Sequence, residues 1–185
     1  MTTSTDTLSS TSHQLRPYWV ALLLGMLTLV YGFGIGIAFG VAEDDMKQAL
    51  NDDAQAVMAE VYKGDAAKAK GVVDKAWSYM KRAHLHAGGL GAASLVMVML
   101  LAFACRPTMI TRGAALLLGV GALGYPIYWM VAGFAAPGLG GTGAAKESFA
   151  WLGMPTSGAV VIGTLATTVL VTMALARRKA PPAAA

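Results

Sequence analysis

The sequence predicts an all-α integral membrane protein: a bundle of four transmembrane helices with an amphipathic helical hairpin in the loop between helices 1 and 2. Three observations carry this prediction. Apolar residues make up 56% of the 185-residue chain and charged residues only 13%, against roughly 25% charged residues in a soluble domain. The mean hydropathy is +0.56. The apolar residues are also gathered into four long runs without a charged residue inside them.

Each run is long enough to cross the hydrocarbon core of a bilayer as a helix, which takes about 20 residues. Inside lipid the backbone must satisfy its own hydrogen bonds, so helices are expected, and the runs lack the alternation of barrel strands. These spans are expected within a membrane domain of residues 18–176, between a disordered cytoplasmic tail (1–17) and a flexible basic tail (177–185). The expected spans are residues 18–42, 85–105, 113–136 and 156–176.

The long loop of residues 43–82 has helical periodicity. Its apolar residues recur three or four positions apart on both sides of Gly64, which indicates two amphipathic helices. We expect them to form a hairpin outside the membrane, packed on the bundle or on a partner. A pair of helices lying on the lipid surface is the alternative, less favoured because the polar faces mix acids with lysines. The stripes are Met46, Leu50, Val57 and Val61, then Ala69, Val72, Val73, Ala76, Trp77 and Met80.

The other two connections differ from this loop. The short basic turn of residues 106–112 requires the second and third spans to be antiparallel neighbours. The glycine-rich segment of residues 137–155 is expected to lie along the membrane interface.

The orientation follows from basic residues close to the span ends. Six of them border the spans on the side of both termini, and by the positive-inside rule this side is cytoplasmic. The eight on the other side are spread over a segment rich in acids, although their raw number favours the opposite orientation. We expect cytoplasmic termini and a periplasmic loop in a bacterial inner membrane, which explains the net charge of +4 without nucleic acid. The six residues are Arg16, Arg106, Arg112, Arg177, Arg178 and Lys179.

Several chemistries find no support in the sequence. A single cysteine, Cys105, excludes an intrachain disulfide and any site with several thiolates. No span has an Asp, Glu, Lys or Arg inside it, which argues against a proton pump or a coupled transporter. No complete catalytic constellation is recognisable, so an enzyme is not the favoured interpretation.

The two histidines at the start of the second span are the most specific indication of a functional site in the sequence. His84 and His86 are two residues apart, about 200° around a regular helix, so they point to nearly opposite sides. His84 continues the apolar stripe of Trp77 and Met80 and is expected to face the protein interior. His86 is expected to face the lipid headgroups or a partner.

A candidate metal or cofactor site forms around these histidines. Met80 lies one helical turn before His84, and the first span ends on the same side at three carboxylates. Histidine with carboxylate suits zinc, copper or iron, and a thioether favours copper. Haem would need Met80 or a partner chain to supply the second ligand, or would be five-coordinate. The favoured alternative is an interfacial cluster of ion pairs and hydrogen bonds. The candidate metal ligands are His84, His86, Glu43, Asp44 and Asp45, and the cofactor ligands His84, His86 and Met80.

The composition and the loop favour a small integral subunit of a larger membrane complex, of respiratory or oxidoreductase type. Its expected partners are other integral membrane subunits and the lipid bilayer. One alternative is a stand-alone haem- or copper-binding protein for electron transfer or metal handling, which visible absorption and metal analysis would detect. A second is a channel for a neutral small solute, which liposome flux would detect.

Overall fold

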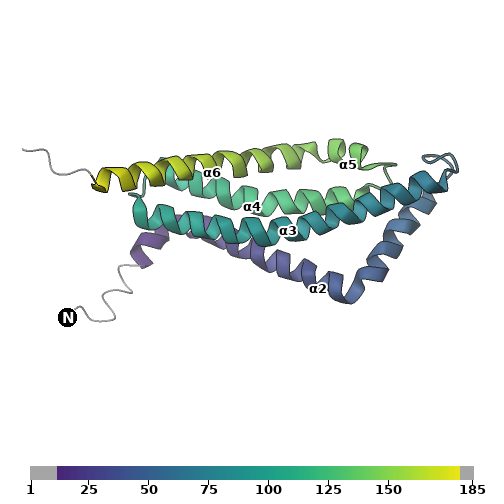
Figure 1. The fold of residues 1–185 in the computed structure, drawn as a ribbon, viewed down its shortest axis with the longest axis horizontal. Helices are drawn as coiled ribbons and strands as arrows, with labels where there is room; N and C mark the ends of the chain where they lie inside the picture. The colour runs from purple at the N-terminus through teal and green to yellow at the C-terminus, as the bar shows by residue number, and fades with distance from the viewer. Residues whose placement is uncertain (1–11, 180–185) are drawn as a thin grey trace, which may run out of the picture.

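The computed structural model describes residues 12–179, and the regular elements in this range are helices. Four of them are long and apolar enough to cross a membrane, which indicates an integral membrane protein. They run side by side in an elongated bundle (Figure 1). The expected tails at residues 1–11 and 180–185 lie outside the described part of the chain. The elements are η1 (Arg16–Tyr18), α2 (Trp19–Ala56), α3 (Ala66–Ala104), α4 (Met109–Ala135), α5 (Thr142–Ser148) and α6 (Ala150–Lys179).

Helix α2 continues beyond the expected first span but changes direction at Ala42. The backbone there leaves helical geometry, with φ −135° and ψ 23°. The bend in α2 is sharp in Figure 1, and the part after it returns toward α3. The bend falls where the apolar run ends and the first carboxylates begin. We call residues 43–56 of α2 the first arm.

Helix α3 is a single helix from residue 66 to residue 104, so the second span and the segment before it share one axis. Asp65 caps its start by accepting a hydrogen bond from the backbone N–H of Lys68 at 2.9 Å. The turn before it is left-handed at Lys63 (φ 55°) and Gly64 (φ 80°), and glycine relieves the strain at the second position. We call residues 66–82 of α3 the second arm.

The long helices pack closely where small residues meet. Helix α3 packs against both α2 and α4, and α4 packs against α6. A Cβ atom on Gly121 would lie 2.5 Å from the backbone nitrogen of Val160, so only glycine permits this approach of α4 to α6. Gly32 and Gly36 likewise face α3, whereas Gly40 meets open space. Close packing therefore accounts for part of the glycine pattern of the first span.

The third and fourth helices begin earlier than the sequence predicts. Helix α4 starts at Met109 rather than residue 113, because Thr108 and Thr111 form a reciprocal capping box. Helix α6 starts at Ala150 rather than residue 156 and runs through Pro155. A short turn, α5 and the first turns of α6 occupy residues 137–155. The expectation that this segment lies along the membrane interface stays a prediction.

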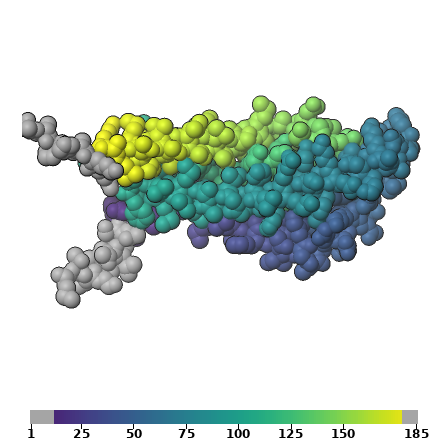
Figure 2. Space-filling view, in the orientation of Figure 1, coloured from purple at the N-terminus to yellow at the C-terminus, as the bar shows by residue number. Residues whose placement is uncertain are grey.

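The outer surface of the bundle is apolar. Only 11% of the most apolar stretch of α6 is buried inside the bundle. Apolar side chains of this helix point outward; Leu165, for example, is 62% exposed. In Figure 2 this helix forms one long flank of the elongated molecule. Such a flank requires lipid or the helices of another chain around it.

Candidate functional site

The predicted site residues lie where the two arms leave the bundle. Met80, His84 and His86 belong to α3, and the three carboxylates follow the bend of α2. Because α3 packs between α2 and α4, side chains on its opposite faces meet different neighbours.

His84 faces α2, as expected, but its partner is a backbone carbonyl. Its Nδ1 lies 3.0 Å from the carbonyl oxygen of Gly32, which can only accept, so Nδ1 carries the proton and donates. The imidazole fits beside Gly36, where an added Cβ would lie 2.9 Å from its Cε1. The ring of Phe39 contacts it edge-on, with centroids 5.9 Å apart.

His86 is half-buried and its ring lies against α4, while the expectation that it also faces headgroups or a partner stays a prediction. Its ring lies 5.0 Å from that of Tyr125 and 6.4 Å from that of Trp129, measured between centroids. The sequence-based interpretation treated α3 as having one buried face. Here α2 covers the face of His84 and α4 covers the face of His86.

An aromatic cluster surrounds His86 and extends along α4. Tyr79 is only 4% exposed and meets Trp129 at right angles, with centroids 4.7 Å apart. The guanidinium carbon of Arg82 lies 5.1 Å from the ring centre of Trp129, within cation–π range. The Tyr-Pro-x-Tyr-Trp sequence of α4 indicated an aromatic cluster, but gave no sign that Tyr79 joins it.

Met80 is a core residue. It is fully buried, and an added Cβ on Gly133 would lie 2.8 Å from its Cγ. The thioether side chain therefore fills the space that this glycine leaves on α4. The apolar stripe that contains Met80 predicted its burial. Packing against α4 explains a methionine at this position without a role as a metal or cofactor ligand.

The carboxylates of the first arm are exposed, and within residues 12–179 no ion pair or hydrogen bond joins them to His84 or His86. Glu43 forms an ion pair with Lys47, one turn later on the same helix. That hydrogen bond raises the pKa of Lys47 above its ordinary value of 10.5. The Lys47 ammonium also lies 5.2 Å from the ring centre of Trp77 on the second arm. Glu43, Asp44 and Asp45 line a shallow hollow at the bend, lined otherwise by residues 39–42.

The predicted metal set is therefore not assembled in this structure. Over residues 12–179, no three histidine, cysteine, aspartate or glutamate side chains are close enough to share a metal ion. His84, His86 and Met80 each have a contact within the bundle, and Glu43, Asp44 and Asp45 are exposed at the bend.

The turn between the arms is fixed to the bundle. Tyr62, 1% exposed, donates a hydrogen bond from its hydroxyl to the carbonyl oxygen of Pro137 at 2.7 Å. Burial raises the pKa of this phenol above 10.0. Leu50 of the first arm is fully buried in the same core as Val73 of the second. The arms thus form one packed body with the end of α4.

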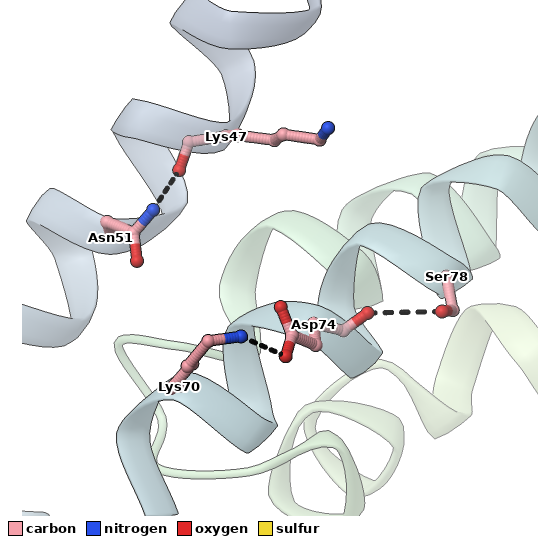
Figure 3. Close-up of polar contacts among 5 residues, drawn as sticks. All are labelled: Lys47, Asn51, Lys70, Asp74 and Ser78. Atoms are coloured by element: carbon pink, nitrogen blue, oxygen red, sulfur yellow. Dashed lines mark hydrogen bonds and ion pairs between the residues drawn. The ribbon is translucent and has the colours of Figure 1, made fainter. Parts of the chain in front are cut away.

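The two arms carry opposite charge. The first arm has five carboxylates and one lysine, whereas the second has five basic side chains and one aspartate. In the described residues the ion pairs stay within an arm, Glu43 with Lys47 and Lys70 with Asp74. Figure 3 shows the polar contacts of Lys47 and Lys70 on their separate helices.

Comparison with known proteins gives no relative: no family model, no curated protein and no solved structure matches this chain.

Proposed function

We propose that this chain is a small integral subunit of a larger membrane complex, and that its two arms form a helical hairpin outside the membrane that binds the partner. The observation that carries this proposal is the separation of charge between two arms that are packed into one body. The described residues add no support for a respiratory or oxidoreductase role, so the proposal is limited to assembly.

Rigidity is the first argument. Leu50, Tyr62 and Ala76 are almost completely buried where the arms meet the end of the bundle. A surface that is already ordered loses little conformational entropy when a partner binds it. A disordered loop of the same length would lose much more.

Charge is the second argument. The ion pairs of the arms are local and exposed, and such pairs contribute about 0–1 kcal/mol to stability. Asp44, Asp45, Asp52 and Asp53 are exposed and pair with no basic side chain among the described residues. The acidic side chains of the first arm, beside the basic side chains of the second arm, attract a partner whose charges have the opposite arrangement. They also orient this partner during binding.

We also propose that both termini are cytoplasmic in a bacterial inner membrane, with the arms in the periplasm. The four described arginines beyond the arms, Arg16, Arg106, Arg112 and Arg177, share the end of the bundle that holds the α3–α4 turn. Residues 12–42 and 83–146 contain no acid to offset them. Basic residues concentrated next to span ends favour the cytoplasmic side.

Purification of the native complex tests the proposal. The full chain is purified from its own membranes in mild detergent, and a complex larger than the monomer is expected. Replacing Asp52 and Asp53 by Asn should weaken the complex several-fold and reduce its sensitivity to salt, because two charges facing the partner are removed. The control replaces Gln48 and Gln55, exposed neutral residues of the same arm, by Ala, and should leave the complex intact. A monomer under all conditions, or equal weakening by both variants, would contradict the proposal.

A further inference from the structure

The end of the bundle opposite the arms has a strongly positive surface. Arg16, Arg106, Arg112 and Arg177 are all exposed there. The ion pairs found in the described residues lie within residues 43–74, so no carboxylate of that part of the chain neutralises these arginines. Four guanidinium groups that form no ion pair within residues 12–179 are thus available at this end to bind anions from outside the protein.

Two of these arginines share a hollow with an apolar wall. It lies between the α3–α4 turn and the last turns of α6, with a volume of about 460 Å³. Arg106 and Arg177 line its polar part, and Leu170 and Met173 line its apolar part. Within this wall Leu170 packs partly against the core of the bundle, whereas Met173 lies on the outward face of α6 and is 47% exposed. The hollow therefore opens onto the surface that lipid chains contact.

The backbone beside Arg106 is held firmly by the capping box. The Thr111 hydroxyl accepts a hydrogen bond from the Thr108 backbone N–H at 2.8 Å. Its single proton can be donated to the Thr108 carbonyl oxygen at 3.0 Å or to the Arg106 carbonyl oxygen at 3.2 Å. Tyr18 donates to the same hydroxyl oxygen at 3.0 Å. The turn that carries Arg106 is thus fixed before any ligand arrives, which lowers the entropy cost of binding.

We propose that this hollow binds one anionic phospholipid, with its phosphate between Arg106 and Arg177 and an acyl chain along Leu170 and Met173. Guanidinium groups bind phosphate through paired, charge-assisted hydrogen bonds. Basic pockets between membrane helices hold anionic headgroups for this reason. The aliphatic wall favours a lipid over free phosphate, because a lipid has an acyl chain that can contact it and a free ion does not.

A second hollow provides a matched control. It has a volume of about 340 Å³ and holds Arg16 and Arg112 beside His13 and Trp19. It carries two arginines at the same end of the molecule, and its apolar lining is Pro17 and Trp19 instead of leucine and methionine side chains. Removing its charges lowers the general positive potential as much as removing Arg106 and Arg177 does.

The test is lipid binding by the purified full-length chain in detergent, followed by native mass spectrometry. The probes are dioleoyl phosphatidylglycerol, dioleoyl phosphatidylcholine and inorganic phosphate. We expect the anionic lipid to bind at least about tenfold more tightly than the zwitterionic lipid. The double variant Arg106→Gln/Arg177→Gln should abolish this difference, whereas Arg16→Gln/Arg112→Gln should keep most of it. Circular dichroism checks that each variant is folded; if the first is not, Arg177→Gln alone should reduce the preference several-fold.

Three results would overturn the proposal. Equal affinity for both lipids would show that charge is not recognised. Equal losses in the two double variants would show diffuse attraction to the whole basic end. Displacement of the anionic lipid by inorganic phosphate at similar concentration would show a site for a free anion instead of a lipid.

Discussion

The Nδ1 atom of His84 donates a hydrogen bond to the carbonyl oxygen of Gly32, 3.0 Å away and 52 residues earlier in the chain. The bond joins the first and second membrane helices just below the bend of α2. It also fixes the tautomer of the imidazole, because the carbonyl can only accept. Gly36, one turn after Gly32, provides the space in which the ring lies.

The first prediction concerns this space. Gly36→Ala would place a Cβ 2.9 Å from His84 Cε1, so the ring must move and its hydrogen bond is lost. Gly34→Ala, on the same helix with open space around it, should be neutral or slightly stabilising because alanine restricts the unfolded chain. Thermal unfolding in detergent should separate the two variants by about 1–2 kcal/mol. In a His84→Ala background the difference should disappear; a difference that persists would show that His84 is not the cause.

The second prediction compares the two histidines. His84→Ala removes a hydrogen bond between helices, worth about 1 kcal/mol. His86→Ala removes ring contacts with Tyr125 and Trp129, worth about 0.5–1.5 kcal/mol. Both variants should therefore lower the unfolding temperature. An unchanged unfolding temperature in His86→Ala would contradict this prediction, because it would show that the ring contacts of His86 do not stabilise the protein.

The contrast between these histidines shows what the sequence could and could not predict. The runs without charge predicted four apolar helices and placed the end of the first within a residue of the bend at Ala42. The stripe through Met80 predicted its burial. Periodicity alone did not reveal that α3 is covered by neighbours on two faces, which decides the surroundings of His86 and Tyr79. The sequence also could not predict the hydrogen-bond partner of His84, because every residue has a backbone carbonyl and the residue type does not reveal which one accepts.

The third prediction concerns the turn between the arms. Tyr62→Phe removes the hydrogen bond to the Pro137 carbonyl and should cost about 1 kcal/mol. It should also speed proteolysis within residues 57–65. Tyr125→Phe is the control, because the Tyr125 hydroxyl makes no hydrogen bond in the described part of the chain. Equal protease sensitivity of the two variants would show that this bond does not hold the turn.

Tyr62 also predicts a dependence on pH. Burial raises its pKa above 10.0 in the folded protein, whereas the unfolded chain keeps a value near 10. The unfolded state therefore loses its proton first as the pH rises. The contribution of this residue is constant below pH 10 and is lost at higher pH. The fall in unfolding temperature above pH 10 should be smaller in Tyr62→Phe than in the unchanged protein.

The fourth prediction uses a buried hydroxyl. Thr167 is 1% exposed, and its Oγ1 has no hydrogen-bond partner. Thr167→Val keeps the shape and removes the unsatisfied group, so the protein should become more stable by about 1 kcal/mol. Thr168, the next residue, is exposed and donates to the Thr164 carbonyl at 2.8 Å; Thr168→Val should change stability little. A loss of stability in Thr167→Val would mean that its hydroxyl has a partner in the membrane.

The fifth prediction tests the arrangement of the chain across the membrane. The turn between the arms and the α3–α4 turn lie at opposite ends of the bundle (Figure 1), so they should be labelled from opposite sides. Cys105 is first replaced by Ala, and a single cysteine is then introduced at Glu60 or at Met109, both exposed. A membrane-impermeant maleimide added to intact bacterial cells lacking an outer-membrane barrier should label the Glu60→Cys protein and not the Met109→Cys protein. Labelling of Met109→Cys alone would reverse the orientation, because the arms would then be cytoplasmic. Labelling of both would contradict the four-span arrangement itself, since residues at the two ends of α3 would share one side of the membrane.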